Sequence, residues 1–328
     1  MLHPIEDEDQ TTKVEATTET KTDSPPNNLA PNGSSSRKPN TITKAYPHLL
    51  SFDELPEWHK DNQYIREGYR PISGSAAVSF RSLLYLHNET INIYTHLIPA
   101  IAFIICEGAV LGHLHTTYYP AVKALDDLIF TAFILTAILC LSFSACYHTL
   151  TNHSVAVDNL WLRLDFVGII LLTVGDFVSG IYMVFWCERV LRIIYWSMIL
   201  GLGVLDIGML VGPKFQGRSW RRFRVMCFVG TGLSGFAPLA HGIYLFGWSQ
   251  MMKQSGMPYY LAEGGLLMLG ALVYATRFPE CFKPGGFDMF GASHQIFHVL
   301  VVLATIAQLL GILDAYAYNH NHRVCSPS

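Results

Sequence analysis

Seven long apolar stretches, separated by short polar connections, dominate the chain from residue 91 onward. Each is about as long as a helix must be to cross ~30 Å of hydrocarbon, at a rise of ~1.5 Å per residue. Because lipid offers no partner to unpaired backbone groups, the pattern predicts an all-α fold, a bundle of seven transmembrane helices. The predicted spans are 91–112, 126–147, 162–185, 190–211, 223–246, 259–276 and 293–317.

Polar and mixed segments flank these spans. Residues 1–45 contain too few large apolar side chains to form a core, so we predict a disordered cytosolic tail. Residues 46–90 mix aromatic and charged positions, and we expect a short amphipathic helix there, capped by Asp53 and ended by Gly68 and Pro71. The seven-helix domain then covers 91–318, and 319–328 form a short outer tail.

Composition agrees with an integral, multi-pass membrane protein. Of the 328 residues, 14% are charged and 51% are hydrophobic. The formal net charge of −3 gives no basic surface for nucleic acid, so we expect no DNA or RNA partner. Nothing in the sequence separates the plasma membrane from an internal membrane.

Basic residues near the span ends favour a cytosolic N-terminus and a C-terminus outside. The outer side would hold only Lys123, Arg189, Arg192, Lys253 and Arg323. The inner side would hold Lys60, Arg66, Arg70, Arg81, Lys214, Arg218, Arg221, Arg222, Arg224, Arg277 and Lys283. The Asn-x-Ser/Thr matches at Asn32, Asn88 and Asn152 would then face the cytosol, so we interpret them as chance matches and not glycosylation sites.

The seven cysteines show no Cys-x-x-Cys spacing and lie mostly inside or beside apolar spans. We interpret them as packing residues or free thiols, and we expect neither a disulfide framework nor a thiolate zinc site.

Polar side chains gather at the predicted inner ends of three spans. His294 and His298, four residues apart, share one face at the start of the last span. His148 ends the second span, with Ser144 one turn deeper on the same face. Asp165 lies within about a turn of the start of the third span. Three imidazoles and one carboxylate are therefore expected at similar depth.

Three imidazoles with an open fourth position are typical of a catalytic zinc site. Zinc would lower the pKa of a bound water, and Asp165 would orient that water or accept its proton. Ser144 would hydrogen-bond either to Asp165 or to the attacked carbonyl.

Simpler interpretations of the same residues remain open. The pair His294 and His298 is also compatible with hydrogen bonds to loops, and His148 with a helix cap. Asp165 would then pair with Arg163 or Arg277.

Further ionisable groups flank or interrupt the spans. His87 and His96 allow a second metal site, although capping of the first helix is the simpler interpretation. Asp176, Asp206 and Glu263 fit a polar cavity or a proton path, or else pairing with neighbouring helices, and they motivate a transporter as the third-ranked function. Separately, Pro238 should kink the fifth span.

Several motifs together resemble the progestin and adipoQ receptor family, which is related to haemolysin III, and most closely its adiponectin-receptor and fungal branch. The similarity extends over roughly residues 50–318 in the right order. The motifs are Gly68-Tyr69-Arg70-Pro71, the run from His87 to His96, Ser144-x-x-x-His148, Leu164-Asp165-Phe166-Val167-Gly168, Phe278-Pro279-Glu280 and Ser293-His294-Gln295-Ile296-Phe297-His298.

The resemblance implies seven helices with a cytosolic N-terminus and a Zn²⁺ ion held by His148, His294 and His298, with Asp165 beside the zinc-bound water. It further implies hydrolysis of the amide bond of a ceramide-like lipid, or else receptor signalling with a structural zinc and no turnover. The implied partners are a membrane lipid, either ceramide or a free fatty acid, and an extracellular protein or a steroid.

Overall fold

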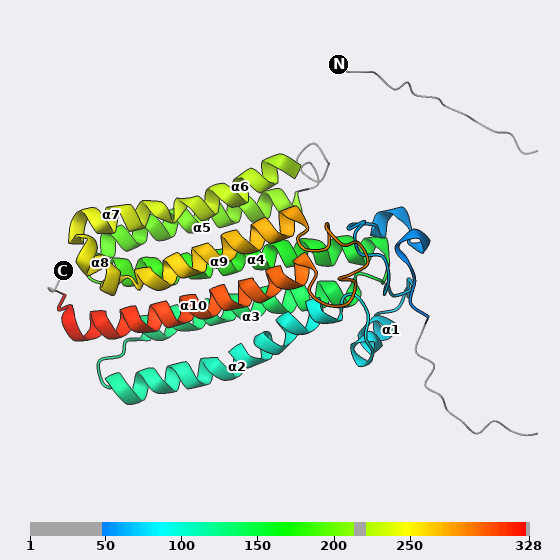
Figure 1. The fold of residues 1–328 in the computed structure, drawn as a ribbon. Coiled ribbons are helices and arrows are strands. Elements are labelled where there is room, and N and C mark those ends of the chain that lie inside the picture. Colours follow the sequence, from blue (N-terminus) through cyan, green and yellow to red (C-terminus); the bar gives the residue numbers. More distant parts are fainter. Residues whose placement is uncertain (1–47, 213–220, 326–328) are drawn as a thin grey trace, which may run out of the picture. The chain divides into compact units, whose positions relative to one another are not determined.

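The computed structural model describes residues 48–212 and 221–325, and within these ranges it is helical with no β-strand. The predicted tail 1–45 and the basic residues Lys214 and Arg218 lie outside the described residues. The predicted all-α fold is confirmed (Figure 1). The main helices are α2 (Thr90–Tyr118), α3 (Ala124–Leu150), α4 (Val155–Val184), α5 (Arg189–Val211), α6 (Arg221–Ser234), α7 (Phe236–Phe246), α8 (Trp248–Gln254), α9 (Met257–Thr276) and α10 (Ser293–His322).

Five of these helices, α2, α3, α4, α5 and α10, are long and apolar enough to cross a membrane. Their outer faces fit a lipid environment, because large apolar side chains such as Ile98 and Ile105 of α2 are 61% and 72% exposed. A multi-pass membrane protein is therefore confirmed at the level of these five helices, and seven crossings remain a prediction.

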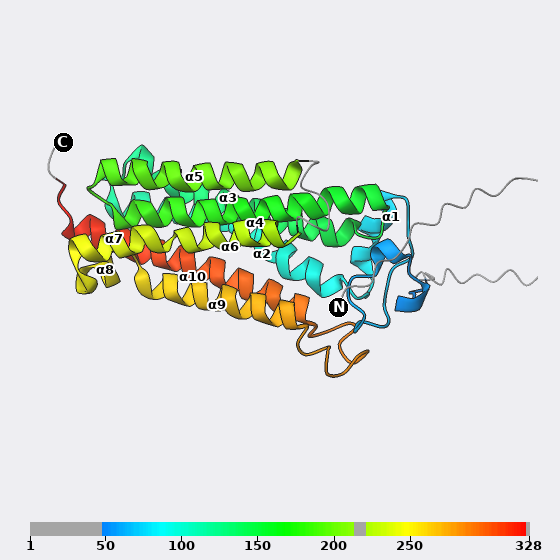
Figure 2. The ribbon, with the colours of Figure 1, turned by 90° about the horizontal axis from the view of Figure 1, so that it is seen from above.

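The fifth predicted span is two helices instead of one. Helix α6 ends at Ser234 and α7 begins at Phe236, and the two follow one line in Figures 1 and 2. Pro238 accounts for the interruption, because it has no N–H for the carbonyl of Ser234 and its ring clashes with that carbonyl. The sixth predicted span corresponds to α9.

The segment before α2 differs from the expectation. Ser51, and not Asp53, caps a 3₁₀ turn, Phe52–Glu54, by exchanging hydrogen bonds with Glu54. No α-helix leads to Gly68, because Pro56 holds the preceding residue extended and a backbone bridge pairs Leu50 with Tyr69. The short helices of this segment are the 3₁₀ turns Phe52–Glu54, Glu57–His59 and Ser82–Leu84, and α1 (Ala76–Arg81).

Two helices extend beyond the predicted boundaries. Helix α4 begins seven residues before the predicted residue 162, at Val155. The predicted outer tail 319–328 is helical as far as His322. Asn319 explains the longer helix, because its side-chain amide donates to the carbonyls of Met183 at 3.1 Å and Gln254 at 2.9 Å.

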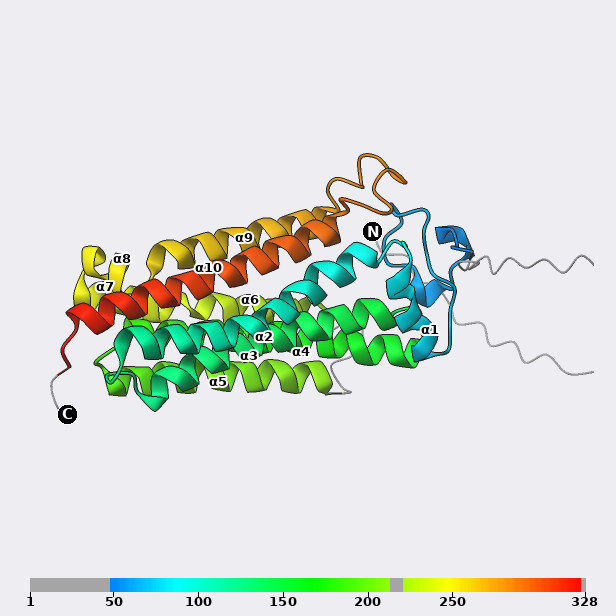
Figure 3. The ribbon, with the colours of Figure 1, turned by 90° about the horizontal axis from the view of Figure 1, so that it is seen from below.

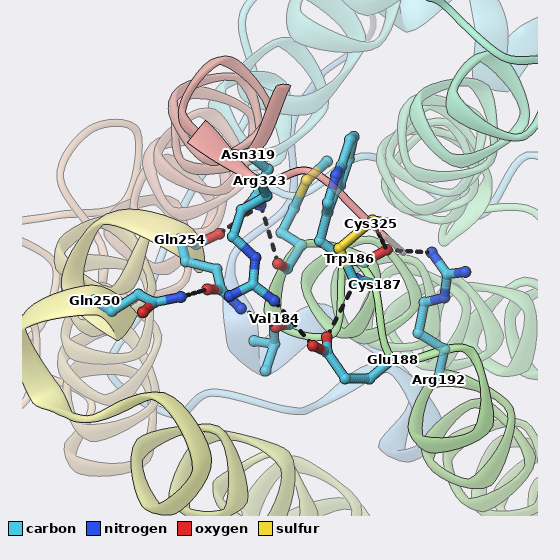
Figure 4. The surroundings of a disulfide bond; sticks show 11 residues. Val184, Trp186, Cys187, Glu188, Arg192, Gln250, Gln254, Asn319, Arg323 and Cys325 are labelled. Carbon is cyan, nitrogen blue, oxygen red and sulfur yellow. Dashed lines mark hydrogen bonds and ion pairs between the residues drawn. A yellow bond between two sulfur atoms is a disulfide. The ribbon is translucent and has the colours of Figure 1, made fainter. Parts of the chain in front are cut away.

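The interpretation of all cysteines as packing residues or free thiols was wrong for one pair. Cys187, in the α4–α5 connection, forms a disulfide with Cys325 beyond α10 (Figure 4). An ion pair of 2.9 Å between Arg323 and Glu188 lies beside it. The fold brings together two cysteines that are 138 residues apart, which local spacing does not reveal.

Helix packing brings the ends of α2, α3, α4 and α10 together. Helix α3 packs against both α2 and α4, and α10 contacts α2, α4 and α9. The starts of α2, α4 and α10 and the end of α3 lie toward the same end of the bundle, as Figures 1 and 3 show. The main apolar core, which includes Phe130, Phe133 and Tyr316, fills the space between these helices.

Asn88 and Asn152 are buried in this end of the molecule, and the side chain of Asn152 bonds to Pro71 and Ser79. Both matches are therefore unsuitable glycan acceptors, while Asn32 lies outside the described residues.

Candidate metal centre

Three histidines from α3 and α10 converge at this end of the bundle. One ligand atom from each of His148, His294 and His298 lies within 4.8 Å of the others, so that the group could hold a metal ion. The Nε2 atoms of His148 and His294 are 3.2 Å apart. His148 and His298 are buried, and His294 is half-buried.

In two of these rings, Nδ1 already has a hydrogen-bond partner. The Nδ1 atom of His148 lies 2.8 Å from a Glu89 carboxylate oxygen, and Asn92 donates to the same oxygen at 2.7 Å. The Nδ1 atom of His298 lies 3.0 Å from the carbonyl of Asn92. Because a carboxylate or carbonyl only accepts, both rings carry their proton on Nδ1 and leave Nε2 free for a metal.

The donor set fits zinc. Two nitrogens that each lie ~2.0–2.1 Å from a tetrahedral zinc ion are roughly 3.4 Å apart. The 3.2 Å between the Nε2 atoms of His148 and His294 is close to this value. Neutral imidazoles whose other nitrogen is bonded to a carboxylate or carbonyl are the usual arrangement around this ion.

Arg70 holds the end of α3 where His148 lies. Its guanidinium is only 2% exposed and donates to the carbonyls of His148 at 2.6 Å and Thr149 at 2.9 Å, and to the hydroxyl of Ser82 at 2.7 Å. Burial lowers the pKa of Arg70 to about 10, so the side chain stays charged at neutral pH. A cation at a helix C-terminus stabilises the last carbonyl groups.

Glu280 holds the start of α10 in a similar way. Its buried carboxylate accepts the backbone N–H of Ser293 at 2.8 Å and the hydroxyl of the same residue. Asn62 donates to the carboxylate at 3.1 Å. An anion at a helix N-terminus satisfies free N–H groups and the helix dipole, so Glu280 fixes the turn that carries His294.

Asp165 lies deeper than predicted but still beside the histidines. It is ten residues into α4, near the Ser144 side chain and within electrostatic range of His148. The close approach of α4 to α3 sets this level, because a Cβ atom on Gly168 would lie 2.8 Å from the Cα of Cys140. Asp165 does not pair with Arg277, whose guanidinium binds Asp61 at 2.9 Å.

His87 and His96 lie close to the centre without joining the group of three ligands. The Nδ1 atom of His87 accepts the backbone N–H of Glu89 at 3.1 Å, and burial together with the charge of Arg70 lowers the pKa of His87 to about 3. The ring of His96 stacks on that of His298 at 3.8 Å. Within residues 48–212 and 221–325, the three ligands above are the single group suited to a metal.

Sequence reasoning missed the roles of Glu89, Arg70 and Glu280 at this centre. Each lies in one of the motifs described above, but the contacts join residues that are 59, 78 and 13 positions apart. The signal available in the sequence was that all three are charged residues in the polar segments that precede the first and the last span.

Comparisons with a family model and with known proteins agree with one another. A sequence model of the family described as haemolysin-III related matches residues 84–309. The chain is 38% identical over 278 residues to the adiponectin receptor protein of Drosophila melanogaster, covering 85% of this chain and 62% of that protein. The chain thus spans less than two thirds of that relative's length.

Two other relatives are covered more fully. The ADIPOR-like receptor IZH2 of Saccharomyces cerevisiae is 36% identical over 294 residues, which cover 88% of this chain and 91% of that protein. Heptahelical transmembrane protein 1 of Arabidopsis thaliana is 34% identical over 273 residues, which cover 82% and 79%.

Proposed function

The chain belongs to the haemolysin III-related family of membrane proteins, and from this premise we propose that it binds zinc and hydrolyses the amide bond of a ceramide-like lipid. His148, His294 and His298 would hold the ion. One observation carries the proposal: His148 and His298 are buried with Nδ1 engaged by Glu89 and Asn92, while the Nε2 atoms of His148 and His294 converge. These hydrogen bonds orient the histidine rings for metal binding independently of the metal itself.

The residues beside the ligands suit amide hydrolysis. Zinc, when bound, supplies a Lewis acid that activates water and polarises a carbonyl group. Asp165 takes the proton of the attacking water and gives it to the leaving nitrogen, while the Ser144 hydroxyl orients Asp165 or donates to the carbonyl oxygen. A carbon–oxygen bond forms and the carbon–nitrogen bond breaks, releasing a fatty acid and a sphingoid base.

The proposed topology has seven crossings, with α6 and α7 forming one crossing and α9 another. The excess of basic residues toward the metal centre supports a cytosolic location for that face. The disulfide between Cys187 and Cys325 supports an oxidising compartment at the opposite face. A centre at the inner end of the bundle suits a lipid whose amide group lies near the membrane surface, and the membrane lipid partner is ceramide or its free fatty acid product.

Replacement of Asp165 tests the reaction. Asp165→Asn should lower ceramide turnover by roughly 10²–10⁴-fold, because a proton acceptor is lost, while zinc stays bound to the three histidines. Asp158→Asn, at the start of α4 with its carboxylate bound to Thr151 at 2.9 Å, is the matched control and should keep activity. Full activity in Asp165→Asn would refute the mechanism.

A signalling receptor with a structural zinc is the second candidate, because the Drosophila and yeast relatives are named as receptors. Its ligand would be an extracellular protein or a steroid. This function requires ligand-dependent signalling that survives Asp165→Asn, and no ceramide hydrolysis by purified protein that contains zinc.

A further inference from the structure

Two carboxyl groups face each other inside the bundle, away from the metal centre. Asp176 of α4 and Glu263 of α9 are each 6% exposed, and their carboxyl groups lie within hydrogen-bonding reach of each other. Asp176 follows Asp165 by eleven residues on α4, which is ~16 Å along the helix axis. The pair is therefore a separate feature of the molecule.

The nearby side-chain hydrogen-bond donors do not donate to these carboxyl groups. Three side chains, Ser179, Tyr260 and Gln308, donate to the backbone carbonyl of Asp176 at 2.9, 3.0 and 3.0 Å. A Cβ atom on Gly180 would collide with the Tyr260 hydroxyl at 1.8 Å, so that only glycine admits this approach. By contrast, Asp176 Oδ1 and the fully buried Gln308 Oε1 have no hydrogen-bond partner in the described part of the chain. The site therefore has more acceptors than donors.

An ionised carboxylate can only accept hydrogen bonds, so two ionised groups cannot bond to each other. Within residues 48–212 and 221–325, no basic side chain compensates the charge of the pair. The other titratable groups that face it are Tyr260 on α9 and Cys140 on α3, and neither supplies a positive charge. Two like charges in contact within a low-dielectric interior are strongly unfavourable.

We propose that Asp176 and Glu263 form a proton-binding site inside the membrane, which holds a proton between the two carboxyl groups at neutral pH. The proton supplies the missing donor and removes the repulsion between the two charges.

Infrared spectroscopy of the purified full chain in lipid nanodiscs tests the site, because a protonated carboxyl group absorbs apart from an ionised one. At pH 7 the wild type should show a protonated-carboxyl band that shifts in D₂O. Asp176→Asn and Glu263→Gln should each lose this band, because the new amide donates to the remaining carboxylate. The exchanged variant Asp176→Glu/Glu263→Asp should retain it.

Asp126→Asn is the matched control and should leave the band unchanged. The Asp126 carboxylate is also buried, but its oxygens accept from Tyr182 at 2.5 Å, Tyr316 at 3.2 Å and the Lys123 N–H at 2.8 Å. Absence of the band from the wild type would overturn the proposal whether or not the variants fold. A band that appears only when choline replaces Na⁺ would assign the site to sodium and overturn it as well. Neither result bears on zinc or on ceramide turnover.

Discussion

At the scale of single residues, the orientation of His148 depends on charged groups that bind no metal themselves. A Glu89 carboxylate oxygen lies 2.8 Å from its ring Nδ1, and the Arg70 guanidinium donates to its backbone carbonyl at 2.6 Å. A ring held at both its side chain and its backbone presents Nε2 in one direction. The affinity for the ion should therefore depend on both residues.

Replacement of Glu89 isolates the carboxylate. Glu89→Gln keeps the size of the side chain but weakens the bond to His148 Nδ1, so zinc affinity should fall by roughly 10–100-fold. Competition with a zinc chelator on purified protein measures the change. Glu67→Gln, an exposed glutamate in the same segment, should have unchanged affinity. Equal affinities in all three proteins would show that Glu89 does not support the ligand.

Arg70 should matter for stability as well as for the centre. Arg70→Lys keeps the charge but cannot reproduce the fork that reaches Ser82, His148 and Thr149. Each lost hydrogen bond to a buried charged group costs about 1.5–3 kcal/mol, so the thermal midpoint in detergent should fall clearly. Arg81→Lys, on exposed α1, serves as control. A midpoint equal to that of the wild type would contradict this role.

The sequence predicted the three histidines that converge, but not the residues that hold them in place. His294 and His298 share a face through helix geometry alone. The contact of Glu89 with His148 depends on how α2 packs against α3, which helical periodicity does not specify. The mutual arrangement of Asp176 and Glu263 likewise arises only when α4 and α9 meet.

At the scale of helices, the packing of α3 against α4 sets the depth of Asp165. Gly168 lies against the backbone of Cys140 with no space for a side chain, and Asp165 is one turn away. The predicted start of α4 was wrong because Asp158 and Asn159 in its first turns are residue types that are typical of a connection between spans. The helix itself was predictable from its apolar length.

Gly168→Ala should separate the two helices. The added Cβ atom meets backbone, which cannot rotate away, so a loss of roughly 1–3 kcal/mol and a fall in ceramide turnover are expected. Thermal unfolding and turnover of purified protein measure both effects. Gly201→Ala on α5, where nothing lies within 4 Å, should change neither. Wild-type behaviour of Gly168→Ala would show that this contact does not set the site.

At the scale of the whole molecule, the disulfide and the metal centre mark opposite ends of the bundle. Cys187 and Cys325 join the α4–α5 connection to the end of α10, and Cys281 lies in the α9–α10 connection, at the end of the bundle where α10 begins (Figure 1). The bundle was predictable from the spacing of apolar stretches, whereas the disulfide was not, because it depends on where the last helix ends.

Thiol labelling on intact cells tests this sidedness. After treatment with a reductant that does not cross membranes, an impermeant maleimide should label Cys187 and Cys325 and should not label Cys281 until the cells are opened. Removal of the disulfide with Cys325→Ser should cost about 2–4 kcal/mol of stability. Labelling of Cys281 on intact cells would contradict the proposed orientation.

The most direct test of the central proposal is bound metal measured by elemental analysis, with ceramide turnover assayed on the same samples of wild type and of His294→Ala/His298→Ala. We predict about one zinc per chain in the wild type, and loss of both metal and turnover in the double variant. Zinc without turnover in the wild type would favour the signalling receptor as the function. A wild type that binds no metal would contradict the account of the centre.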